Sequence, residues 1–193
     1  MQFSVFGALF ALAAVLLAGC GIFDPEKNPV PPPEPPAEYV IPSQPGYVLN
    51  NLEIAYSHRD STAYKEVYDS TYVGSSLDQS DTNPETISFT YSEEVAHIAA
   101  LARSPTISSV TFDVGPATSW NRLTSDDPSH PEWAVIQIAG TSLDVQVTDG
   151  RDTWQASGLK EYFQFSFAPT TPAPSSPSDT LWKIVRWVET RSP

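Results

Sequence analysis

Cysteine is almost absent from this chain, which has Cys20 and no other among its 193 residues. A single cysteine cannot form an internal disulfide, so the folded part must be stabilised by its packed core alone. Basic side chains are also scarce, because 10 Lys and Arg stand against 23 Asp and Glu and give a formal charge of −13. Nucleic-acid phosphates and anionic lipid headgroups both attract basic side chains. The composition therefore argues against nucleic acid as a partner and against a protein surface that docks on lipid.

Motifs that carry well-known chemistries are missing as well. The three histidines, His58, His97 and His130, form no pair four residues apart and show no spacing typical of metal ligands. The chain has no nucleophile elbow, no phosphate-binding loop and no dinucleotide fingerprint. The sequence therefore predicts no catalytic, cofactor-binding or metal-binding residue and no cofactor. The alternative is a metal site in the acidic loop that holds Asp126, Asp127, His130 and Glu132.

An apolar run without charge, from Phe3 to Leu17, lies at the start of the chain and leads into Leu17-Ala18-Gly19-Cys20. A membrane-spanning helix needs about 20 apolar residues, whereas an apolar core followed by small residues is typical of a secretory signal. We therefore interpret residues 1–19 as a signal peptide, although no Lys or Arg precedes the apolar run. An ordinary secretory signal or a short anchor is the alternative to the more specific interpretation that follows.

Leu17-Ala18-Gly19-Cys20 resembles the lipobox of bacterial lipoproteins. The resemblance implies that Cys20 is the lipidation site, carries acyl chains such as palmitate and becomes the new N-terminus. It also implies an exported, periplasmic protein that its lipid anchors to a membrane of the cell envelope. Gly21, rather than Asp, follows the cysteine, and by the same resemblance this points to the outer membrane.

Residues 20–45 combine this cysteine with a proline-rich tether, in which eight prolines lie between positions 29 and 45. Proline fixes φ and lacks an amide donor, so the segment favours extended polyproline II. At about 3.1 Å per residue, the tether can hold a domain roughly 70 Å from the lipid. A ligand for a proline-recognition module is the alternative. The remaining residues, 46–193, are expected to form one domain, which at this size buries about 70% of its unfolded surface.

The first stretch of that domain, Val48–Tyr72, predicts two helices. Apolar residues recur at helical spacing at Val48, Leu49, Leu52, Ala55 and Tyr56. Residues 57–60 break the pattern, and Asp60 is placed to cap a second helix by accepting from its free amides. The stripe continues at Tyr64, Val67, Tyr68 and Tyr72, so the second helix is expected to reach Tyr72.

The rest of the domain is typical mainly of strands. Alternating apolar residues predict strands over residues 87–91, 110–114, 133–139, 143–147, 154–156, 163–167 and 181–189, with a third helix over 92–104. Asp149-Gly150 indicates a hairpin turn. The polar segments 74–84, 120–131 and 169–179 are expected to be loops. The last strand is apolar on both faces, which predicts a central place in its sheet.

Helices followed by strands indicate an α+β fold. The chain resembles the nuclear transport factor 2-like superfamily, which shares its cone-shaped fold with ketosteroid isomerase. The residues that carry this resemblance are Leu52, Ala55, Tyr56, Arg59, Asp60 and Tyr64, and the terminal run Trp182–Trp187. The resemblance implies a cystatin-like α+β roll, with N-terminal helices packed in the concavity of a curved antiparallel sheet. That fold hosts both enzymes and non-enzymes, so it does not decide function.

Enzymes of this superfamily work inside the cone with a carboxylate base among aromatic residues. The candidate acids, Asp113, Asp144 and Glu161, alternate with apolar neighbours and are therefore expected to face solvent. Six aromatic residues are candidates to line a pocket, with plain core packing as the alternative: Tyr56, Tyr68, Trp133, Trp154, Phe165 and Trp182.

We therefore predict a membrane-tethered, non-catalytic binding or assembly lipoprotein. The alternatives are a protein that holds a small apolar ligand and an isomerase-, dehydratase- or hydrolase-type enzyme. An apolar cavity without an inward acid would favour the ligand-holding protein, and an inward Asp or Glu beside a Tyr would favour the enzyme. A filled cone with an exposed aromatic sheet face would favour the assembly module.

Arg186 and Trp187 are the candidate interface residues. Strict alternation puts Trp182, Ile184 and Arg186 on one face of the last strand and Trp187 on the opposite face. Large aromatics and Arg are enriched where interfaces carry their energy, and the resemblance implies a sheet through which a homodimer or another protein partner could pack. The alternative is that both tryptophans are core residues and that Arg186 reaches out to water.

Overall fold

The computed structural model describes residues 37–78, 84–139, 144–148, 152–156, 161–170 and 180–191. The predicted signal peptide, Cys20, most of the tether and the Asp149-Gly150 turn lie outside these ranges. Within them, no helix is both long enough and apolar enough to cross a membrane.

The first two helices form as the sequence predicts, around a sharp corner. Helix α2 (Pro45–Ser57) buries the whole expected stripe, and α3 (Ser61–Val67) begins where Asp60 Oδ1 accepts from the amides of Thr62 and Ala63 at 3.0 Å. The predicted cap is therefore confirmed. Arg59 makes the corner with a left-handed φ of 53°, and its guanidinium donates to the carbonyl of Ile107 at 2.6 Å.

The second helix is shorter than predicted, because it ends at Val67 and strand β1 (Tyr68–Asp78) follows at once. Tyr64, Tyr68 and Tyr72 are spaced by four residues, which is close to one helical turn and also an even number of strand residues. Their side chains therefore face inward whichever element carries them, and periodicity alone could not distinguish the two. The helix predicted to reach Tyr72 and the loop predicted from residue 74 are both wrong.

The main sheet has six strands in the order β2-β1-β9-β8-β5-β4. Its members besides β1 are β2 (Thr86–Thr90), β4 (Trp120–Thr124), β5 (Ala134–Ala139), β8 (Glu161–Thr170) and β9 (Leu181–Arg191). Strand β9 lies inside the sheet, as predicted, and the α+β architecture is confirmed. The sheet is mixed rather than antiparallel, because β1 runs parallel to β9 whereas the other neighbours are antiparallel.

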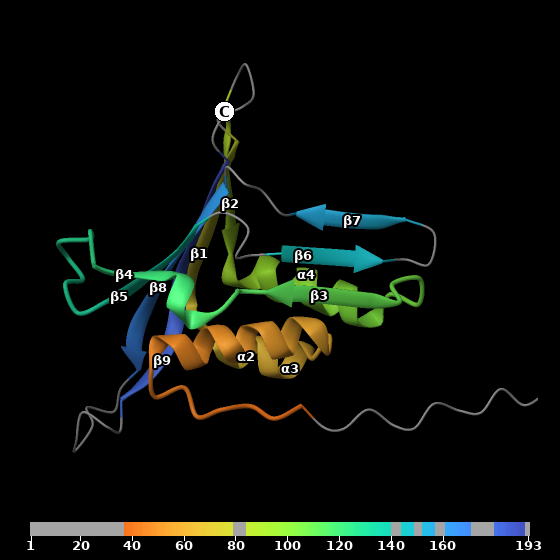
Figure 1. The fold of residues 1–193 in the computed structure, drawn as a ribbon, viewed down its shortest axis with the longest axis horizontal. Helices are drawn as coiled ribbons and strands as arrows, with labels where there is room; N and C mark the ends of the chain where they lie inside the picture. The colour runs from red at the N-terminus through yellow and green to blue at the C-terminus, as the bar shows by residue number, and fades with distance from the viewer. Residues whose placement is uncertain are drawn as a thin grey trace, which may run out of the picture. The chain divides into compact units, whose positions relative to one another are not determined.

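A second, three-stranded sheet has the order β3-β6-β7. It consists of β3 (Ser109–Asp113), β6 (Asp144–Thr148) and β7 (Thr153–Ala156). Strands β6 and β7 pair antiparallel, as expected for the predicted hairpin. Helix α4 (Tyr91–Arg103) starts with a capping box between Thr90 and Glu93, and a short 3-10 turn, η1 (Ala117–Ser119), precedes β4. Figure 1 shows α2 and α3 lying together on one side of the small sheet.

The core fills the space between the helices and the inner face of the main sheet. Register places Trp187, Phe165 and Ile136 side by side on β9, β8 and β5, and all three are buried. Phe112 of β3 contacts Trp187 edge-on and stacks on Tyr56 of α2 at 4.8 Å between ring centroids. The core therefore joins the two sheets and the helix pair.

A bulge in β9 decides which way Trp187 points. Ser166 pairs with Arg186 but the next residue, Phe167, pairs with Ile184, so Val185 is one extra residue in the ladder. An extra residue shifts the alternation of every side chain beyond it. Ile184 and Trp187 therefore both enter the core, where Trp187 is 6% exposed. The prediction that Trp187 faces outward is therefore wrong.

Residues that precede position 46 already make hydrogen bonds with the folded domain. Residues 39–42, which we call the strap, lie beside α2 and have no regular secondary structure. The amide of Asn51 pairs with both backbone groups of Val40, at 2.9 and 2.7 Å, and the amide of Trp182 donates to the carbonyl of Pro42 at 2.9 Å. Tyr39 donates to Asp60 at 3.0 Å. The compact unit accordingly begins at Ala37, nine residues earlier than the boundary that composition suggested.

Candidate functional site

The concave side of the main sheet holds a cavity of about 200 Å³, which we call the cone pocket. Its walls come from α2, α4, β2 and β9. The lining residues are Tyr56, Phe89, Glu93, Glu94, His97, Trp187 and Glu189. Three carboxylates and three aromatic rings thus surround one small space.

A hydrogen-bonded cluster of tyrosines holds Glu94 at the edge of this pocket. Tyr64 donates to Glu94 Oε2 at 3.0 Å and Tyr72 donates to Oε1 at 3.4 Å. The hydroxyls of Tyr64 and Tyr68 lie 2.9 Å apart, and those of Tyr64 and Tyr56 lie 3.4 Å apart. Both oxygens of the carboxylate therefore have a phenol donor, which fixes the orientation of the Glu94 side chain.

Burial raises the pKa of all four phenols in this cluster, and the charge of Glu94 raises each of them further. Deprotonation would place a phenolate out of water and near a carboxylate, which low-dielectric surroundings make costly. The tyrosines therefore remain hydrogen-bond donors at neutral pH.

Gly74 makes room for this arrangement. A Cβ atom built on Gly74 would collide with the hydroxyl of Tyr72. Any larger residue would therefore have to push the Tyr72 hydroxyl away from Glu94. The glycine on β1 is thus part of what positions the carboxylate.

Sequence analysis missed Glu94, because it was assigned to the acidic first turn of a helix. The signal was present in the spacing, since Glu94 lies four residues before Ile98 and seven before Leu101, on the stripe that faces the core. Of the three candidate acids, the structure describes the side chain of Asp113 alone. Asp113 is exposed and accepts from the amide of Gly115 at 2.7 Å, and the side chains of Asp144 and Glu161 lie outside the described part of the chain.

The six aromatic candidates do not form one pocket. Tyr56 lines the cone pocket, whereas Tyr68 and Phe165 are core residues that are at most 1% exposed. Trp133 lies half-buried elsewhere and Trp182 lines a separate groove. The side chain of Trp154 lies outside the described residues.

Trp133 belongs to a cluster around Arg186, the other predicted interface residue. Arg186 donates to Asp127 at 2.9 Å, and its guanidinium carbon lies 5.0 Å from the ring centroid of Trp133. His130 stacks on the same indole at 4.2 Å and its Nδ1 lies 3.1 Å from Glu132. Arg186 is thus engaged within its own chain. In the described part of the chain, no three His, Cys, Asp or Glu side chains are close enough to hold a metal ion.

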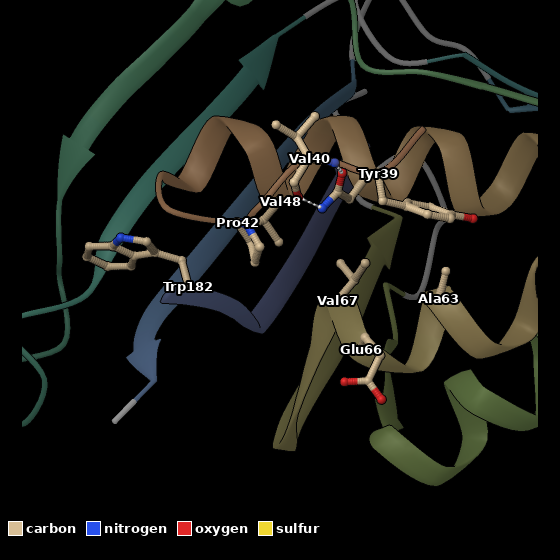
Figure 2. Close-up of a pocket in the computed structure, with 9 residues that line it drawn as sticks. Tyr39, Val40, Pro42, Val48, Ala63, Glu66, Val67 and Trp182 are labelled. Atoms are coloured by element: carbon tan, nitrogen blue, oxygen red, sulfur yellow. Dashed lines mark hydrogen bonds between the residues drawn. The ribbon is translucent and has the colours of Figure 1, made fainter. Parts of the chain in front are cut away.

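The separate groove lies between the strap, the two N-terminal helices and β9, and encloses about 280 Å³. Figure 2 shows Tyr39 and Trp182 at its two ends, with Val40 and Pro42 along one wall and Val67 and Glu66 along the other. The chain's own N-terminal strap therefore forms one wall of the groove.

Comparisons with known proteins bear on the fold. No family model matches the chain, and no curated protein matches it. Among solved structures, it is similar to the beta subunit of a putative aromatic-ring-hydroxylating dioxygenase from Novosphingobium aromaticivorans, at 6% identity and a TM-score of 0.50, covering 76% of this chain and 85% of that one.

Two further structures show the same kind of likeness. One is a putative dehydratase of the NTF2-like family from Streptomyces avermitilis, at 12% identity and a TM-score of 0.49, covering 79% of this chain and 96% of that one. The other is an NTF2-like protein with a cystatin-like fold from Novosphingobium aromaticivorans, at 13% identity and a TM-score of 0.43, covering 75% and 77%. At such identities the likeness concerns the fold alone.

The described residues therefore have an α+β fold, with helices beside a mixed six-stranded sheet, and this fold is similar to that of the dioxygenase beta subunit. Within that fold, the distinctive feature of this chain is a small pocket with a carboxylate held by tyrosines.

Proposed function

We propose that this protein is a lipid-anchored binding protein of the cell envelope, which captures a small molecule in the cone pocket without transforming it. The observation that carries the proposal is the 200 Å³ cavity on the concave side, whose walls combine aromatic rings with fixed carboxylates. Ligand sites in proteins are concave, mostly preformed and lined by apolar surface with a few oriented polar groups. The polar walls also argue against the alternative of a purely apolar ligand.

A cone-pocket enzyme is the second candidate, because Glu94 is an inward carboxylate beside tyrosines. A carboxylate base and phenol donors are what proton abstraction next to a carbonyl requires. However, the phenols of Tyr64 and Tyr72 already donate to the two oxygens of Glu94, so these two donors are not available to polarise a substrate carbonyl. This geometry suits a fixed binding group better than a base.

An assembly module is less well supported than a ligand-binding protein. Trp187 is buried and Arg186 is engaged with Asp127 and Trp133. The two side chains that suggested an interface on the last strand therefore both have contacts within their own chain.

The lipid anchor can be tested separately from the pocket, because the lipobox resemblance assigns it to one residue, Cys20. We expect Cys20→Ser to move the full chain from the membrane fraction to the soluble fraction and to remove the acyl mass from its N-terminus. Multiple acyl chains anchor stably, since each buried methylene contributes about 0.8 kcal/mol. A Cys20→Ser protein that stays membrane-bound without acyl mass would show that another segment holds it.

Binding can be tested with three probes of one shape: cyclohexylamine, cyclohexanol and cyclohexanecarboxylate. We expect ligand-observed NMR at millimolar concentration to detect binding of at least one probe to the full chain in detergent. His97→Trp should abolish that binding, because His97 is exposed and lines the pocket. Ala96→Trp is the matched control, since Ala96 is its exposed neighbour on α4 and does not line the pocket. Binding that neither variant changes, or no binding at all, would contradict the proposal.

A further inference from the structure

The described residues that line the cone pocket include three with carboxyl side chains, Glu93, Glu94 and Glu189, and no Lys or Arg. The chain as a whole carries a formal charge of −13. A cleft lined by one sign of charge concentrates ligands of the opposite sign and excludes those of its own. Carboxylates and phosphates are therefore poor candidates for this pocket.

A metal ion does not satisfy this arrangement either. In the described residues, no three His, Cys, Asp or Glu side chains come together as metal ligands. An organic ammonium needs hydrogen-bond acceptors but no complete coordination shell, so fewer carboxylates are enough to bind it.

The rest of the wall is aromatic. Tyr56, Phe89 and Trp187 line the same cavity, and Phe89 is still 36% exposed. Aromatic faces attract organic cations through their quadrupole and also cover hydrocarbon. The acidic and the aromatic residues of this small cavity thus both favour an organic cation as the ligand.

We propose that the cone pocket, the site on which the proposed function rests, takes a small organic cation. Its ammonium group lies toward Glu94 and Glu189, and its hydrocarbon part lies against Tyr56, Phe89 and Trp187. Glu94 is the main recognition residue, because its two phenol donors hold it in place before the ligand arrives. A carboxylate has about four acceptor positions, so it can accept from an ammonium as well. Such preorganisation lowers the ordering cost of binding.

The same three cyclohexyl probes test this class, since they share one ring and differ in charge at pH 7. We expect cyclohexylamine to bind the full chain at least tenfold more tightly than cyclohexanol or cyclohexanecarboxylate. Glu94→Gln should weaken the amine at least tenfold and leave cyclohexanol within twofold. Glu66→Gln is the matched control, because Glu66 is exposed on α3, lies outside the cone pocket and changes the net charge equally.

Glu189→Gln gives a second variant if Glu94→Gln does not fold, and it should also weaken the amine selectively. The possible failures are distinguishable. If cyclohexanol or the carboxylate binds as tightly as the amine, and His97→Trp abolishes that binding, the pocket is a ligand site but the cation assignment is wrong. If the amine binds best and neither Gln variant weakens it, the assignment to these carboxylates is wrong. If no probe binds in a way that His97→Trp abolishes, both the cation assignment and the proposed function are overturned.

Discussion

Replacing Trp187 by Ala is expected to lower the free energy of unfolding by about 3–5 kcal/mol, the range typical of a truncated core tryptophan. The indole is 6% exposed and its ring centroid lies 4.9 Å from that of Phe165 and 5.8 Å from that of Phe112. These neighbours belong to strands of two sheets, so they cannot collapse into the space that the indole leaves. For a domain of this size, such a loss lowers the melting temperature by roughly 10 °C, which thermal and urea unfolding would measure.

Two control variants separate packing from other roles of this position. Trp187→Phe keeps most of the ring and removes the indole N–H, which has no hydrogen-bond partner among the described residues. We expect it to cost far less than Ala, because no hydrogen bond is lost. Arg186→Ala, at the adjacent position, removes a half-exposed ion pair with Asp127. We expect it to lower the free energy of unfolding by only about 0–1 kcal/mol, the range typical of exposed ion pairs.

The opposite outcome has a clear meaning. If the Trp187→Ala protein keeps its stability but loses self-association, Trp187 is a surface residue of the sheet and not a core residue. This outcome would also contradict the bulge at Val185, since that bulge is what turns Trp187 inward.

The apolar stripe of α2 and the N-cap of α3 could be predicted from the sequence, because each is a short pattern that is specific to a helix. The stripe from Val48 to Tyr56 is fully buried on α2, and Asp60 caps α3 with the residues expected. Both features depend on spacing over a few residues and on the free amides of one helix end. Such signals do not need the rest of the fold.

Strand identity and register were harder to predict, because they depend on distant partners. The run from Tyr68 to Tyr72 fits a helix or a strand equally well, and it becomes β1 because β9 lies beside it in parallel. The bulge at Val185 likewise arises from pairing with β8. A single residue of shift reverses the face of every following side chain, so strict alternation misplaced Trp187.

The site was only partly predictable for a related reason. Tyr56 belongs to an evident apolar stripe, but Glu94 looks like a solvated acid until Tyr64 and Tyr72 are known to reach it. An inward carboxylate is unfavourable unless donors satisfy it. The sequence shows the carboxylate but not the donors, which come from a helix and a strand elsewhere in the chain.

A chain that begins at residue 46 is expected to be about 3–5 kcal/mol less stable than one that begins at residue 37. Removing the strap leaves the side chain of Asn51, which is 8% exposed, without its two hydrogen bonds to Val40. A buried polar group without partners costs about 1–3 kcal/mol. Val48, which is 1% exposed and lines the groove together with Val40 and Pro42, would also become more exposed, at about 25 cal/mol per Å² of apolar surface exposed. Urea unfolding of the two proteins measures the difference.

Asn51→Leu tests whether the strap acts through these hydrogen bonds, because its effect should change sign. In the chain from residue 37, Asn51→Leu breaks both bonds to Val40 and should destabilise the domain. In the chain from residue 46, the same change replaces an unpaired buried amide with an apolar side chain of similar size and should restore stability in part. A chain from residue 21 serves as the control and should match the one from residue 37. If starting at residue 46 costs less than 1 kcal/mol, the strap does not contribute to the fold and the domain begins where composition alone placed it.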